Sequence, residues 1–260
     1  MDAFKQPNLG RIIQSLRQEK KLTQEELVEK CNVNVRTLQR IEAGEVTPRD
    51  YTIKMILSAL DYGFDTFESS LRHKESIKRL QVGWIAGVVY FVLSIVDVTV
   101  DFSRFELDLP TYFPFLYILV KAIVATSFSL FMLGFLAIGK TEKSPLLQIA
   151  AYLMAGSLII ICIHDSISVF SSISYEDFMG IKGIEAVAFG GIDVLFGIAI
   201  FRLASKMGMM AKVAGMLEII VGACFVTFVL ALLGLILLIP ATILEIVLIY
   251  KYYDLLTAKE

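Results

Sequence analysis

The sequence predicts an all-α protein in which a helical N-terminal bundle precedes a transmembrane domain of six spans. Hydrophobic residues make up 56% of the 260 residues, and the mean hydropathy is +0.69, both above the usual range of soluble domains. This excess lies C-terminal to about Gly83. We therefore expect an N-terminal domain over residues 1–68, a connector helix over 69–81, six spans over 82–254 and a cytosolic tail over 255–260.

The charge balance of the first domain is nearly neutral, and its N-terminal sequence predicts that it stays in the cytosol. Residues 1–80 contain 14 Lys/Arg against 12 Asp/Glu, and the remainder contains 10 against 14. Such a small positive balance does not by itself indicate nucleic-acid binding, so motifs must decide that question. The first twenty residues contain no apolar stretch typical of a cleavable signal peptide, which predicts that this domain is not exported.

The first helix signal in the N-terminal domain is a capping box. Thr23 followed three residues later by Glu26 starts a helix by satisfying its free backbone amides. Leu27 and Val28 give this helix an apolar face, and we expect it to end near Cys31.

A tight turn and a second short helix follow. Asn32 stands where a left-handed backbone is needed, a conformation that Asn tolerates well. Val33 is expected to enter the core, Asn34 to cap the next helix and Gly44 to close it.

The second helix has two distinct faces. Leu38 and Ile41, three residues apart, share a buried face, whereas Arg36 and Arg40, one turn apart, project the other way. Two short helices joined by a tight turn, the second exposing long hydrogen-bond donors, are typical of a helix-turn-helix motif.

Residues from about Leu9 to Phe67 resemble the XRE family of lambda-repressor-like (Cro/cI-type) helix-turn-helix domains. The resemblance rests on "LTQEEL", the turn residue Val33, "RIEAG", and a fourth helix after "TPRDY" that runs through "IKMILSALDY". It covers about a quarter of the chain. The sequence departs from the family in Val28, where Ala is usual, and in Asn32, where Gly is usual, which predicts slightly shifted helix packing.

The resemblance implies double-stranded DNA as a partner and a role for each interface residue. Val35, Arg36 and Arg40 would face base edges, with Thr37 and Gln39 at the flanks, while Gln24 would contact a phosphate. Arg49 would lie against the DNA backbone or minor groove, and Arg17 and Glu42 resemble the family's structural ion pair. The predicted DNA-binding set is Gln24, Asn34, Val35, Arg36, Thr37, Gln39, Arg40 and Arg49. Two alternatives stay open: a domain that binds protein, and an arginine pair that is only solvated.

Six apolar segments have the length needed to cross a bilayer. They are about Val82–Val100, Phe115–Gly139, Leu146–His164, Gly183–Leu203, Val213–Leu233 and Leu235–Tyr253. The last two are hardest to divide, and we expect the turn between Leu232 and Pro240. Weak similarity among the spans suggests three helical hairpins, although any two amphiphilic spans look alike.

Loop charges predict the orientation of the spans. One face carries Arg72 to Arg79, Lys140, Lys143, Arg202, Lys206, Lys212, Lys251 and Lys259, whereas the opposite face carries only Arg104 and Lys182. Because positive residues stay in the cytosol, we expect a multi-pass protein of the cytoplasmic membrane with both termini cytosolic.

Several ionisable residues lie within the spans, where they are costly and usually face the protein interior. Asp193, Glu218 and Glu245 are deep, and Lys121 and Glu185 are at similar depth and could pair. Asp97, His164 and Asp165 lie near the outer ends, where they need no special explanation. Two interpretations of the deep acids remain open: hydrogen bonding between helices, or a polar cavity that senses a ligand, a cation or protons. Gly190, Gly191 and Gly197, which surround Asp193, favour packing.

No motif indicates catalysis. The sequence lacks a Ser-His-Asp set, a phosphate-binding loop and a His/Cys cluster with metal spacing, so we predict no enzyme activity, no cofactor and no metal. Cys31, Cys162 and Cys224 predict no disulfide framework.

The leading hypothesis is a membrane-anchored one-component transcription regulator. Its head would bind a pseudo-palindromic operator as a homodimer, and its spans would sense an unidentified small ligand or ion. The alternatives are a transporter or channel with a regulatory head, and a membrane scaffold whose head binds protein.

Overall fold

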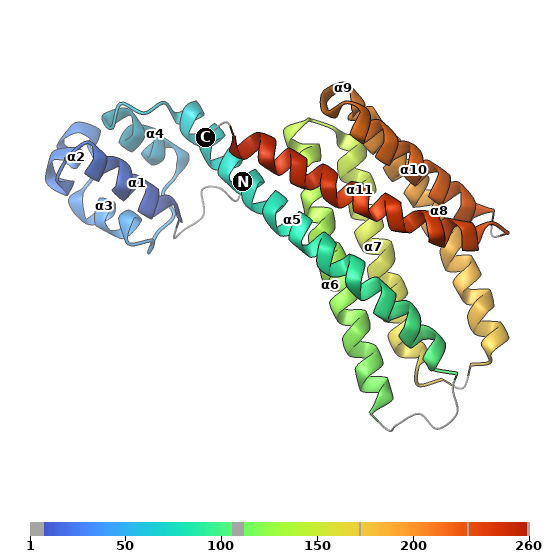
Figure 1. The fold of residues 1–260 in the computed structure, drawn as a ribbon. Coiled ribbons are helices and arrows are strands. Elements are labelled where there is room, and N and C mark those ends of the chain that lie inside the picture. The colour runs from blue at the N-terminus through green and yellow to red at the C-terminus, as the bar shows by residue number, and fades with distance from the viewer. Residues whose placement is uncertain (1–7, 106–111, 172, 228, 259–260) are drawn as a thin grey trace. The chain divides into compact units, whose positions relative to one another are not determined.

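The computed structural model describes residues 8–105, 112–171, 173–227 and 229–258, and these residues form helices and short connections without strands (Figure 1). The chain divides into two compact units, Met1–Glu75 and Ser76–Glu260, called here the head and the membrane domain. Each unit is described by itself.

Four helices and the start of a fifth build the head. They are α1 (Asn8–Glu19), α2 (Gln24–Cys31), α3 (Val35–Glu42), α4 (Asp50–Ala59) and the first turns of α5 (Phe64–Ser103). Each contributes apolar side chains to one core, which extends from Leu9 to Leu71 and includes the fully buried Leu27, Leu38 and Ile53.

The predicted capping box is confirmed. The Thr23 hydroxyl accepts a hydrogen bond from the Glu26 amide at 3.1 Å, and the Glu26 carboxylate accepts one from the Thr23 amide at 2.7 Å. Because the Thr23 amide stabilises the charged form, the pKa of Glu26 lies below its usual value. Helix α2 thus begins where the sequence predicts.

The turn between α2 and α3 also follows the prediction. Asn32 adopts the left-handed conformation, with φ 49° and ψ 40°. The Asn34 side chain accepts a hydrogen bond from the Arg36 amide at 2.8 Å, and so caps α3. Gly44, with φ 76°, follows the end of that helix.

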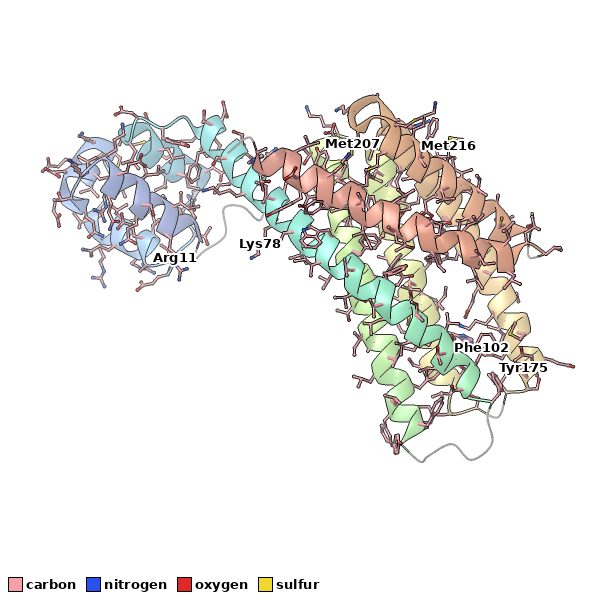
Figure 2. The ribbon with its side chains drawn as sticks, viewed as in Figure 1. Arg11, Lys78, Phe102, Tyr175, Met207 and Met216 are labelled. Atoms are coloured by element: carbon pink, nitrogen blue, oxygen red, sulfur yellow. The ribbon has the colours of Figure 1, made fainter. Side chains whose placement is uncertain are left out.

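Six helices of the described chain are long and apolar enough to cross a membrane, as in a multi-pass membrane protein. They are α5 (Phe64–Ser103), α6 (Phe113–Thr141), α7 (Pro145–Ser168), α8 (Tyr175–Arg202), α10 (Met209–Val226) and α11 (Ala231–Thr257), with the short α9 (Ala204–Met207) between α8 and α10. Figure 2 shows Phe102 and Tyr175 at one end of the membrane domain and Met207 at the other.

Two expected boundaries differ from the structure. The connector predicted over residues 69–81 is not a separate helix, because α5 continues through it into the first span. The turn expected between Leu232 and Pro240 lies earlier, since α10 ends at Val226 and α11 begins at Ala231. Pro240 lies inside α11, where neighbouring helices allow a membrane helix to keep a proline.

The end of the chain differs as well. Helix α11 continues to Thr257, so the predicted tail over 255–260 begins as helix, and residues 259–260 lie outside the described part.

The closest helix packing in the membrane domain joins α8 to α10. A β-carbon added to Gly190 would lie 2.7 Å from the Gly222 carbonyl oxygen, and one added to Gly197 would lie 2.9 Å from that of Gly215. Backbones can approach this closely only where both helices carry glycine. The tightest pairing therefore crosses the boundary between the expected second and third hairpins.

Candidate functional site

Helix α3 presents a polar face formed by the predicted recognition residues. The side chains of Arg36, Thr37, Gln39 and Arg40 are exposed, whereas Leu38 and Ile41 are fully buried on the opposite side. The predicted division of this helix into two faces is therefore present in the structure. An exposed row of long donors on a short, well-anchored helix suits contact with base edges in a major groove.

A buried ion pair fixes α3 to α1. The guanidinium of Arg17 binds the Glu42 carboxylate through Nε–Oε1 at 2.8 Å and Nη2–Oε2 at 2.9 Å, and it also donates to the Leu22 carbonyl at 2.8 Å. The hydrogen bond to Glu42 raises the pKa of Arg17 above its usual value. The pair implied by the family resemblance is thus confirmed, and it holds the end of α3 in place.

Two glutamines extend this anchor toward the recognition face. Gln24, at the start of α2, donates to Glu42 at 2.8 Å, and Gln39 donates to Gln24 at 3.3 Å. Sequence reasoning missed both bonds, because it considered Gln24 only as a phosphate contact. The half-buried Gln24 is held at the junction of α2 and α3.

The remaining expected contact residues are Val35, Asn34 and Arg49, and each has a different environment. Val35 is half-buried and packs against the head core, so its side chain is less available to base edges than expected. The Asn34 side chain caps α3, and Arg49 is exposed just before α4. Arg40 lies 3.4 Å from Glu45, which partly offsets its charge.

The head has the geometry of a helix-turn-helix domain, joined in one chain to helices that can span a membrane. Residues 13–67 match the family model HTH_3, described as "Helix-turn-helix", and this match indicates a DNA-binding domain of the XRE type. No curated protein and no solved structure matches the chain.

A buried ionic network lies in the membrane domain. Lys121 on α6 is 1% exposed, and its ammonium lies 2.9 Å from Asp97, 2.9 Å from Asp101 and 3.0 Å from Asp165. The expected pairing of Lys121 with Glu185 is wrong, because three aspartates surround Lys121 instead. Asp165 lies three residues before the end of α7, as expected, but its side chain is fully buried within the protein.

Lys182 completes this network. Its ammonium lies 2.6 and 2.7 Å from the two Asp165 oxygens and 2.9 Å from Glu185. Sequence reasoning missed this residue, because it counted Lys182 only as a loop charge. The three-residue spacing of Lys182 and Glu185 on α8 is a signal that could have revealed the contact.

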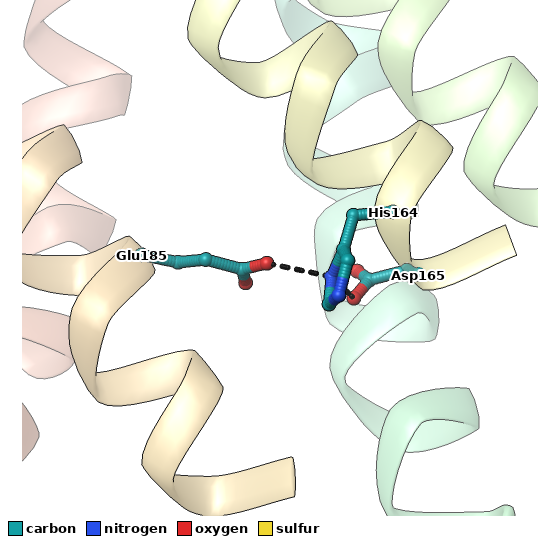
Figure 3. Close-up of side chains that lie close together, drawn as sticks. All are labelled: His164, Asp165 and Glu185. Atoms are coloured by element: carbon teal, nitrogen blue, oxygen red, sulfur yellow. Dashed lines mark ion pairs between the residues drawn. The ribbon is translucent and has the colours of Figure 1, made fainter. Parts of the chain in front are cut away.

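Figure 3 shows His164, Asp165 and Glu185 close together, with Glu185 reaching His164 from the neighbouring helix. The His164 Nδ1 and the Glu185 carboxylate are 3.0 Å apart, and these three residues bring three ligand atoms within 4.8 Å of one another. Such a set could hold a metal ion. However, the Lys182 ammonium already lies against Asp165 and Glu185, and so supplies the positive charge that an ion would bring.

The three deep acids form a second group, called here the carboxyl cluster: Asp193 on α8, Glu218 on α10 and Glu245 on α11. They are 0%, 2% and 5% exposed. The interactions of Glu218 with both Asp193 and Glu245 bring the three together. The structure thus gathers three predicted residues on adjacent helices, apart from Lys121 and Glu185.

Proposed function

We propose that this protein is a membrane-anchored one-component transcription regulator. The head binds a specific DNA sequence, the membrane domain anchors it, and a signal received by the membrane domain changes DNA binding. The exposed polar face of α3 carries the proposal, together with membrane-spanning helices in the same chain.

Base readout is assigned to α3. Arg36 and Arg40 offer planar guanidinium groups suited to two hydrogen bonds with one guanine, and Thr37 and Gln39 lie beside them. Gln24, Asn34 and Arg49 at the ends of neighbouring helices are assigned to the sugar-phosphate backbone, which sets the register. Val35 supports the turn and contributes an apolar edge.

One small head makes too few contacts for specificity in a genome. We therefore propose that the protein acts as a homodimer on a pseudo-palindromic operator, with one α3 in each half-site. A change in the membrane domain that alters the spacing of the two heads changes operator affinity, provided that the signal binds the two states unequally.

The proposed location is the cytoplasmic membrane with both termini in the cytosol. Lys140, Lys143 and Lys206 support this orientation, because positive residues gather on the cytosolic face. The residues proposed to take part in sensing are the carboxyl cluster, Asp193, Glu218 and Glu245, and the network residues Lys121 and Glu185.

The test uses the full-length protein in lipid nanodiscs with fragments of the genome of its source. Sequencing of the retained fragments should give a shared, two-fold symmetric motif. Arg36→Ala and Arg40→Ala should each weaken binding to that motif by about 1–3 kcal/mol, or about 5- to 150-fold. Lys54→Ala is the matched control, because Lys54 is an exposed cation of α4 outside the recognition face.

Two results would contradict the proposal. Retention of fragments without a common motif would show that the protein binds the DNA phosphates without regard to sequence. Equal losses in the Lys54 and α3 variants would show that α3 does not read bases, since only net charge would then matter.

A further inference from the structure

The carboxyl cluster differs from the ionic network in one respect: among the described residues, no basic side chain pairs with it. The groups that act on Asp193, Glu218 and Glu245 are the other acids of the cluster. In the described part of the chain, both oxygens of Asp193 and one oxygen each of Glu218 and Glu245 are buried without a hydrogen-bond donor. Burying an unpaired carboxylate is very costly, so the cluster requires a bound positive charge.

The position of two of these acids is set by backbone packing. Asp193 lies three residues after Gly190 and four before Gly197, and Glu218 has the same spacing to Gly215 and Gly222. Gly190 faces Gly222, and Gly197 faces Gly215, so the two helices run antiparallel with one acid of each between the two contacts. The packing of α8 against α10 therefore holds the backbones of these two acids close together.

Contacts within the cluster form a chain. Glu218 lies in the middle and interacts with Asp193 on one side and with Glu245 on the other. Tyr90 of α5 also lies near Asp193 and Glu245. Carboxylates only accept hydrogen bonds, so two of them can bond to each other only when one carries a proton.

Three acids arranged in a row are better placed to bind protons than to bind a metal ion. A hard cation needs several oxygens around one point. Within the described residues, the set with three ligand atoms mutually within 4.8 Å is His164, Asp165 and Glu185, and the carboxyl cluster does not form such a cage. A proton needs only two oxygens, which each neighbouring pair of the cluster provides.

We propose that Asp193, Glu218 and Glu245 form a proton-binding site that joins α8, α10 and α11. With protons bound, the acids hydrogen-bond across the helices; when protons leave, like charges repel where the backbones are in contact. Proton occupancy therefore controls the packing of these helices. The claim that this packing controls DNA binding rests on the proposed function. The claim that the cluster binds protons does not.

Infrared spectroscopy of the full-length protein in nanodiscs tests the proposal directly. Protonated carboxylic acids have a carbonyl band separate from those of carboxylates and of the backbone, and this band shifts in heavy water. We expect the band at neutral pH and its loss as pH rises. Asp193→Asn, Glu218→Gln and Glu245→Gln should each reduce it, whereas Glu176→Gln, at an exposed position of α8, should leave it unchanged.

Each outcome decides the question. Absence of the band at neutral pH in protein that keeps its helix content would overturn the proposal, and this measurement needs no variant. Changes in the carboxylate bands on addition of Ca²⁺ or Mn²⁺, without a protonated band, would replace it by a metal site. A normal band in protein that binds no operator would support the proton site and remove only the proposed regulatory function.

Discussion

Arg17 and Glu42, 25 residues apart, form a buried ion pair with two nearly parallel hydrogen bonds of 2.8 and 2.9 Å. The pair joins α1 to the end of α3. Because Glu42 also accepts the bond from Gln24, one carboxylate holds three helices together. The recognition helix therefore depends on a residue that lies outside its exposed face.

Arg17→Met should destabilise the head by about 3–5 kcal/mol, because it leaves the Glu42 carboxylate buried without its partner. Arg17→Met/Glu42→Leu should recover most of this loss, since two apolar groups leave no unpaired charge. Urea unfolding of residues 1–75 is a suitable measurement, because residues 9–71 supply the core of the head. Equal stability of the single and double variants would contradict this explanation.

Glu45→Gln should strengthen operator binding. Glu45 lies 3.4 Å from Arg40 and carries a negative charge beside the face that we propose binds DNA. Removing the Glu45 charge frees Arg40 and lowers the repulsion between the head and the DNA phosphates. This predicts a several-fold gain in operator affinity that shrinks with added salt. Binding isotherms at two salt concentrations would show this, and Glu29→Gln on α2 serves as the control for net charge. A gain that is the same in both variants would rule out a specific effect at Arg40.

Gly190 and Gly191 provide a matched pair for testing the α8–α10 contact. Alanine at 190 would place its methyl group 2.7 Å from the Gly222 carbonyl oxygen, whereas alanine at 191 would have no neighbouring atom within 4 Å. Gly190→Ala should therefore lower the thermal stability of the detergent-solubilised protein. Gly191→Ala should leave it unchanged or raise it, because alanine favours a helix by about 1 kcal/mol over glycine. Similar melting temperatures for both variants would mean that the helices are not in backbone contact.

Cysteine labelling tests the proposed topology. The native Cys31, Cys162 and Cys224 are buried and should give little background. A membrane-impermeant maleimide added to intact cells should label Tyr175→Cys and should fail to label Lys143→Cys until the cells are opened. The opposite pattern would reverse the orientation, and labelling of both positions in intact cells would overturn the six-span arrangement.

Glu26 should make the head less stable in acid. Its pKa is lowered in the folded state by the Thr23 amide, so its contribution is complete above the unfolded pKa of about 4.3 and is lost as pH falls through the folded pKa. Glu26→Gln keeps an oxygen that can accept the Thr23 amide but does not titrate. The free energy of unfolding of residues 1–75 should therefore fall less steeply below pH of about 5 in this variant. Identical pH dependence of the unfolding free energy in the two proteins would exclude Glu26 as a cause of the loss of stability in acid.

The head could be predicted closely from the sequence because its signals are local. Thr23 and Glu26, or Asn32 and Asn34, act within one turn of helix, so their types and spacing are sufficient. The Arg17–Glu42 pair was predictable only from the family resemblance, since nothing in the spacing of these residues joins them.

The membrane domain was predictable as a set of spans but not in its contacts. Hydropathy is continuous from Val213 to Tyr250, so it does not place the turn, and Pro240 misleadingly resembles a helix breaker. The partners of Lys121 come from α5 and α7, and long-range pairing of this kind leaves no trace in periodicity. The depth of Asp193, Glu218 and Glu245 was predictable, whereas their meeting depends on which helices are neighbours.

Pro240 gives α11 a preferred place to bend. Proline has no amide hydrogen, so the carbonyl of Ile236, one turn earlier, lacks its usual partner within the helix, and the proline ring presses against that turn. Pro240 lies five residues before Glu245. The hydrogen-bond ladder of α11 is therefore weakest close to the acid that this helix contributes to the carboxyl cluster.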